Sequence, residues 1–90
     1  QEEPDPTQQR IQRASRLVNG GSYGEALRVL RQLRKQVPGS SRVATLYLQV
    51  ASGYQTGGNP ERAREVYQEY LNTWPSGQMA SEVRSIMQRL

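Results

Sequence analysis

The chain aligns with itself when it is shifted by 37 residues, and this internal repeat constrains the fold more than any other feature. A repeat period of about 20 to 50 residues is typical of folds that stack one supersecondary unit on the next. The shift brings glycine pairs, small alanines and proline breaks into register together, which indicates two copies of one unit. The aligned pairs are Ala14 with Ala51, Leu17 with Tyr54, Gly20 with Gly57, Gly21 with Gly58, Ala26 with Ala63, Leu30 with Tyr67, Leu33 with Tyr70, Pro38 with Pro75, Leu46 with Val83 and Val50 with Met87.

Four breaks divide the chain into five segments. Two of them are rich in glycine, at 19–22 and 56–60, and two contain proline, at 37–40 and 74–77. Gly and Pro are the strongest local signals for turns, and no segment between them shows the sustained two-residue alternation of a strand. We therefore expect an all-α fold of five helices, over residues 7–19, 23–36, 41–55, 60–74 and 77–90.

Several residues at the helix starts have the chemistry of caps. Asp5 can cap the first helix, because a proline follows it at the position where a missing amide costs nothing. Ser22 and Glu25 have capping-box spacing ahead of the second helix, and Asn59 can cap the fourth. The segment 41–55 is apolar around most of its circumference, so it should form the most buried helix.

The second unit carries the residues that lead to a known family. It matches the tetratricopeptide repeat signature at Tyr47, Val50, Ala51, Tyr54, Gly58, Ala63, Tyr67, Tyr70 and Pro75. The first unit resembles that signature less closely, because Arg10 and Arg13 stand where large apolar residues are expected. A terminal repeat, which has no neighbour to cover it, tolerates this departure. The resemblance implies a right-handed α-α superhelix of two helix pairs and a C-terminal capping helix.

The repeat length points to one branch of the family. The usual tetratricopeptide period is shorter, and the longer period here is similar to that of envelope-associated members from Gram-negative bacteria. Examples are the lipoprotein of the outer-membrane protein assembly machine and the periplasmic partner of the Tol–Pal system. On this basis the chain divides into a polar tail at 1–6, repeat one at 7–40, repeat two at 41–76 and a capping helix at 77–90. The resemblance implies a periplasmic or envelope-associated location, with a cytoplasmic one as the alternative.

The residue content argues against catalysis. The chain has neither His nor Cys, which removes the commonest general base, thiol chemistry and nearly every zinc arrangement. Glu61, Glu65 and Glu69 form a row at helical spacing, but Arg62 and Arg64 interleave with them, so we expect an exposed, solvated face. The glycine breaks lack the Lys and hydroxyl of a phosphate-binding loop. We expect no enzyme activity, catalytic residue, cofactor or metal site.

The resemblance implies that the chain binds a protein or peptide partner. Family members hold partners on a concave surface built largely by the first helix of each pair. That groove is expected to be polar and to hold an extended peptide through side-chain hydrogen bonds. No carboxylate clamp is expected, because much of the clamp surface is occupied by Ile11, Leu48, Ser15 and Ser52. The groove residues are expected to be Gln12, Ser15, Asn19, Thr45, Leu48, Gln49, Ser52, Gln55 and Arg89.

Other positions offer competing interfaces. Arg28, Arg31 and Lys35 form a basic stripe that either solubilises the outer face or meets nucleic acid or an anionic surface. Nucleic acid is disfavoured, because no aromatics interleave with these charges. Trp74, just before a proline, could present a partly exposed ring as an anchor. Met87 lies in the last apolar stripe, which either caps the second repeat or mediates self-association. No segment is long and apolar enough for a membrane span.

Overall fold

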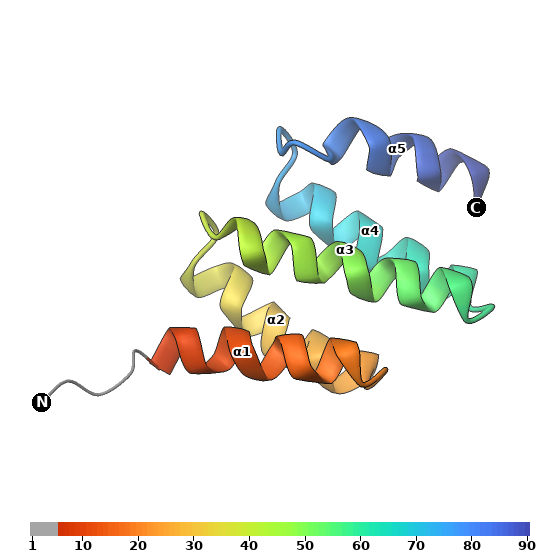
Figure 1. Cartoon of the computed structure of the whole chain (residues 1–90). Coiled ribbons are helices and arrows are strands. Elements are labelled where there is room, and N and C mark those ends of the chain that lie inside the picture. Colours follow the sequence, from red (N-terminus) through yellow and green to blue (C-terminus); the bar gives the residue numbers. More distant parts are fainter. Residues whose placement is uncertain (1–5) are drawn as a thin grey trace, which may run out of the picture.

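The computed structural model describes residues 6–90, and within that range the chain forms five α-helices and no strand. This confirms the all-α, five-helix prediction (Figure 1). The expected cap at Asp5 lies outside the described residues, and the first helix begins one residue before the predicted boundary. The helices are α1 (Pro6–Asn19), α2 (Tyr23–Gln36), α3 (Ser41–Thr56), α4 (Pro60–Thr73) and α5 (Ala80–Arg89).

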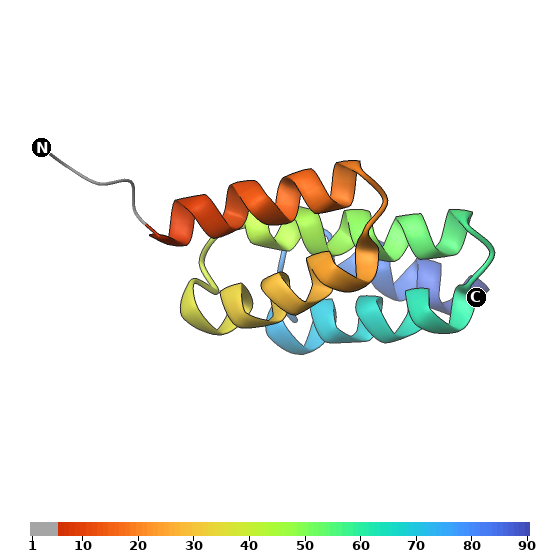
Figure 2. The same cartoon turned by 90° about the horizontal axis from the view of Figure 1, so that it is seen from below.

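The helices form antiparallel pairs that stack side by side. Each helix packs against the next one in the chain, and α1 also contacts α3. Both views place α1 and α3 on one side of the molecule and α2 and α4 on the other, with α5 against α4 at the C-terminal end (Figures 1 and 2). The first helices of the two pairs are therefore packed neighbours, and the second helices are joined through the side chains of Arg31 and Glu69.

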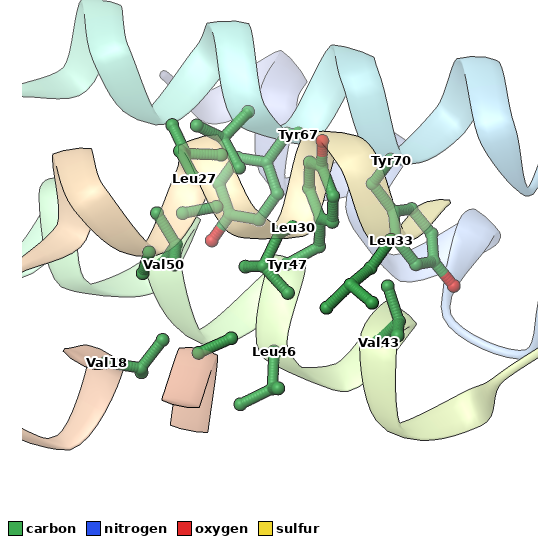
Figure 3. Close-up of a cluster of buried hydrophobic side chains, with 14 of the residues drawn as sticks. Val18, Leu27, Leu30, Leu33, Val43, Leu46, Tyr47, Val50, Tyr67 and Tyr70 are labelled. Atoms are coloured by element: carbon green, nitrogen blue, oxygen red, sulfur yellow. The ribbon is translucent and has the colours of Figure 1, made fainter. Parts of the chain in front are cut away.

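A single hydrophobic cluster runs through the stack. It includes Leu30 and Leu33 from α2 together with Tyr47 from α3, all completely inaccessible to solvent. Figure 3 places Tyr47 near the middle of this cluster, with its hydroxyl directed toward α4. Helix α3 contributes more buried residues than any other helix, which confirms that it is the most buried one. The small residues Ala14, Ala26, Ala51 and Ala63 are also fully buried, which lets the paired helices approach closely.

The turn after α1 is a Schellman motif. The amide of Ser22 donates to the carbonyl of Leu17 at 2.8 Å, and that of Gly21 donates to Val18 at 3.0 Å. Gly21 has φ of 81°, in the left-handed region that only glycine adopts without strain. These bonds satisfy carbonyls that the end of the helix would otherwise leave unpaired.

The same motif closes α3, one repeat later. The amide of Asn59 donates to Tyr54 at 2.8 Å, that of Gly58 donates to Gln55 at 3.2 Å, and Gly58 has φ of 85°. The ends of α2 and α4 also correspond, since Val37 and Trp74 each donate to the carbonyl four residues earlier at 2.7 Å. The sequence repeat is thus a repeat of backbone geometry.

Two local predictions were wrong. Ser22 makes no side-chain capping bond to α2, although the Schellman turn before it and its backbone angles of φ −86° and ψ 65° are similar to those at Asn59, its counterpart one repeat later. Asn59 does cap α4, accepting from the amide of Arg62 at 3.3 Å.

Helix α5 begins at Ala80 and not at 77, where the sequence predicted its start. The serine that caps α3, Ser40, is replaced by Gly77 in the next repeat, and glycine has no side chain with which to cap a helix.

Replacing either left-handed glycine by alanine tests the repeated turn. Gly21→Ala and Gly58→Ala should each lower the free energy of unfolding by about 1–2 kcal/mol, because a Cβ is strained at positive φ although nothing else lies within 4 Å. Urea denaturation measures the change. Gly39→Ala is the matched control: it is also free of neighbours but lacks a positive φ, so it should change stability by less than about 1 kcal/mol. Equal effects at all three positions would contradict the strain argument.

Candidate functional site

An apolar pocket of about 280 Å³ lies between the first half of α3 and the loop that connects α4 to α5. Its floor is formed by Ala44 and Leu48 of α3, and one wall is formed by Trp74. Met79 stands at the edge with 38% of its surface exposed, the one large apolar side chain of the described residues that is classed as exposed. The complete lining is Pro38, Gly39, Ser40, Ser41, Ala44, Thr45, Leu48, Tyr70, Trp74, Gly77, Gln78 and Met79.

The wall of the pocket is fixed by the surroundings of Trp74. Its indole Nε1 donates to the carbonyl of Pro38 at 2.6 Å, which joins the two proline loops. The ring also packs edge-on to Tyr47 and tilted against Tyr70, with centroid separations of 5.7 Å and 5.2 Å. Trp74 is half-buried, as the sequence suggested, but its polar edge is already bonded within the chain. It therefore offers an apolar surface of fixed position and no free donor.

A second hollow, of about 340 Å³, lies between α1 and α3. It adjoins the apolar pocket, since Ser41 and Thr45 line both. Arg42 is its one charged lining residue, and no side-chain hydrogen bond or ion pair engages Arg42 anywhere in residues 6–90. The lining residues are Ser15, Asn19, Ser41, Arg42, Thr45, Leu46 and Gln49. We call the two hollows together the α3 groove.

The structure brings most of the expected groove residues together. Ser15, Asn19, Thr45, Leu48 and Gln49 all line the α3 groove. A more open depression continues from Gln49 along α3, lined by Val18, Tyr23, Gln49, Ser52, Gly53, Thr56 and Gly57. This places a run of polar side chains on one face of α3.

The remaining expected groove residues lie elsewhere. Gln55 accepts a hydrogen bond from the hydroxyl of Tyr67 at 2.9 Å, so its amide is held against α4. Gln12 and Arg89 are exposed but line none of the hollows along α3. Ile11, which was expected at the groove surface, is only 5% exposed and belongs to the core.

A charged cluster on the opposite face joins the two helix pairs. Arg31 of α2 binds Glu69 of α4 in a bidentate fashion, with Nε to Oε1 at 3.0 Å and Nη2 to Oε2 at 2.7 Å. The hydroxyl of Tyr47 donates to the same carboxylate at 3.1 Å. Arg34 lies 3.7 Å from Glu69 and donates to the hydroxyl of Thr73 at 3.2 Å. Helices α2, α3 and α4 therefore meet at one carboxylate.

The cluster controls the protonation of its members. Burial raises the pKa of Glu69, but the hydrogen bonds from Arg31 and Tyr47 outweigh it and hold the pKa below the ordinary value. Burial and the nearby carboxylate raise the pKa of Tyr47, so its phenol remains a donor at neutral pH. Bidentate pairing of this kind is stronger than an ordinary surface ion pair.

This arrangement corrects two expectations about the charged faces. The row Glu61, Glu65 and Glu69 is not uniformly exposed, because the Glu69 side chain is only 20% accessible and bridges to α2. Arg31, which was expected in the basic stripe, is paired with Glu69. Arg28 and Lys35 remain exposed.

No group of three or more Asp, Glu, His or Cys side chains in residues 6–90 is arranged to hold a metal ion. Within the same range, no helix is both long and apolar enough to cross a membrane. Met87 is half-buried and packs against the core, beside a hollow lined by Glu61, Arg64, Glu65, Gln68 and Glu69.

No family model, curated protein or solved structure matches the chain. The groove is therefore characterised by its own geometry. Sequence reasoning missed Arg42 and Met79, although each had a signal. Arg42 is the one charged residue of the segment 41–55, and the glycine at the position equivalent to Ser40 delays α5, which leaves Met79 in the loop.

Glu69 should contribute strongly to stability. Glu69→Gln removes the charge that holds Arg31, Arg34 and Tyr47, and should lower the free energy of unfolding by about 2 kcal/mol at pH 7. Since the folded-state pKa of Glu69 is depressed, its contribution is complete above the ordinary pKa of 4.5 and is lost as the pH falls below that value. Urea denaturation at several pH values measures both effects.

Glu65→Gln is the matched control on the same helix. Its carboxylate is 60% exposed and lies 3.8 Å from Arg62, so the loss should be below about 0.5 kcal/mol. If the two variants lost the same stability, or if Glu69→Gln kept the acid sensitivity of the parent chain between pH 5 and about pH 3, the assigned role of Glu69 would be wrong.

Proposed function

We propose that this chain is a tetratricopeptide-type module, wound as a right-handed superhelix, that binds a peptide segment of a partner protein in the α3 groove. The single observation that carries the proposal is the continuity of an apolar pocket with a polar hollow along α3, through Ser41 and Thr45. Ligand sites in proteins combine an apolar cavity with a few placed polar groups in this way. The repeated turns at Gly21 and Gly58 support the repeat architecture.

The groove suits a peptide better than a compact ligand. The apolar part has room for one or two side chains, and the polar part runs alongside it over α1 and α3. Ser15, Asn19 and Gln49 could satisfy the amides and carbonyls of an extended backbone. The proposed role is that of a scaffold without enzyme activity or cofactor. The longer repeat period favours an envelope or periplasmic setting over a cytoplasmic one.

Selection from a random peptide library displayed on phage tests the proposal. Peptides enriched on the immobilised chain should bind it and lose at least about tenfold in affinity for Leu48→Arg, because the substituted side chain fills the apolar pocket and places a charge there. Gln32→Arg is the matched control. Gln32 is exposed on α2 and lines no part of the groove, so this variant should bind as the parent does.

Two results would contradict the proposal that the α3 groove binds peptides. Either no peptide is enriched above the uncoated support, or the enriched peptides bind Leu48→Arg as tightly as the parent chain. Circular dichroism of both variants must first show unchanged helix content, so that loss of binding is not loss of folding.

A further inference from the structure

The part of the chain that forms the α3 groove carries an excess of positive charge. Glu25 is the one carboxylate between residues 6 and 60. Arg31 and Arg34 are engaged by Glu69 on the opposite face. The exposed cations that remain in this part of the chain are Arg10, Arg13, Arg16, Arg28, Lys35 and Arg42. A surface with this balance attracts anionic partners and repels cationic ones.

Arg42 differs from the other exposed cations because it lines the groove itself. It stands in the first turn of α3, and it shares the polar hollow with Ser41 and Thr45, which also line the apolar pocket. No carboxylate lines either hollow. The guanidinium of Arg42 has no partner in the described residues and lies next to an apolar cavity. A ligand that fits both therefore needs an anionic group for Arg42 and an apolar group for the cavity.

The apolar requirement is set by the pocket wall. Leu48 and Met79 offer aliphatic and thioether surface, and the indole of Trp74 is fixed by its bond to Pro38. A volume of about 280 Å³ admits a branched aliphatic side chain such as leucine. Because the indole Nε1 already bonds to Pro38, the Trp74 ring offers no free donor to a polar side chain placed against it.

From these observations we infer that the α3 groove selects an acidic peptide: an internal segment in which an aliphatic side chain enters the apolar pocket and a neighbouring Asp or Glu pairs with Arg42. This inference rests on the proposed peptide-binding function and specifies its ligand class. The contact is with a side-chain carboxylate within the segment, so the peptide needs no free C-terminus.

Titration with three capped heptapeptides tests the inference on the full chain. The probes are acetyl-Ala-Asp-Ala-Leu-Ala-Asp-Ala-amide, the same peptide with Lys for Asp, and the acidic peptide with Gly for Leu. Trp74 is the one tryptophan of the chain and lines the pocket, so its fluorescence reports occupancy. The acidic leucine peptide should bind at least about tenfold more tightly than either of the others, with an affinity that falls as salt rises.

Charge-reversal variants test whether Arg42 causes the preference for acidic peptides. Arg42→Glu should reverse the preference, so that the lysine peptide binds more tightly than the acidic one. Arg13→Glu makes the same change in net charge at an exposed position outside the groove, and it should keep the acidic preference. If both variants weakened the acidic peptide equally, general attraction would explain the selectivity and the role of Arg42 would be overturned.

The outcomes separate this inference from the proposed function. Equal binding of the acidic and lysine peptides, with loss on replacing Leu by Gly, would overturn the acidic selectivity and leave a peptide groove in place. Failure of all three probes to change Trp74 fluorescence would overturn the inference. The phage selection then decides independently whether the groove binds peptides of another kind.

Discussion

The carboxylate of Glu69 is the point at which directional bonds from three helices join the two repeats. It accepts from Arg31 on α2 and from Tyr47 on α3 while belonging to α4 itself. The hydrophobic driving force that packs the two helix pairs together is itself non-directional. A bidentate guanidinium–carboxylate contact has fixed geometry and therefore adds a directional constraint to the interface. Removing only one partner would strand the others in a partly dry environment, which is why the carboxylate matters more than its exposed neighbours.

The contacts of Glu69 also extend to the apolar pocket on the other face of the molecule. Tyr47 donates to Glu69 through its hydroxyl and packs its ring against Trp74, whose indole in turn bonds to Pro38. One tyrosine thus connects the charged cluster to the wall of the apolar pocket. These contacts hold the Trp74 ring in place beside two loops that contain glycine and proline. A pocket with preformed walls loses little conformational entropy when a ligand enters.

Much of the fold could be predicted because the repeat is encoded locally. The glycine pairs end the first helices in identical Schellman turns, and the apolar stripes orient each helix toward its neighbours. Where the repeat is broken, local rules were less reliable. Ser22 had capping-box spacing but makes no capping bond, whereas Asn59, its counterpart one repeat later, caps α4. Gly77, at the position of Ser40, delayed α5 and moved Met79 out of the helix. Most of the groove on α3 was predicted because a helix buried on one side must expose the residues of the other.

The sequence by itself determined the number and order of the helices, the repeated turns and the polar character of the exposed face of α3. Each of these depends on residues within a few positions of one another. The tertiary structure alone decided which charges are paired and where the pocket lies. The first-repeat counterparts of Tyr47 and Glu69 are Arg10 and Gln32, both exposed, so comparing the repeats could not reveal the cluster. An ion pair between residues 38 positions apart forms only when packing brings α2 and α4 together, and so does a pocket whose walls come from separate loops.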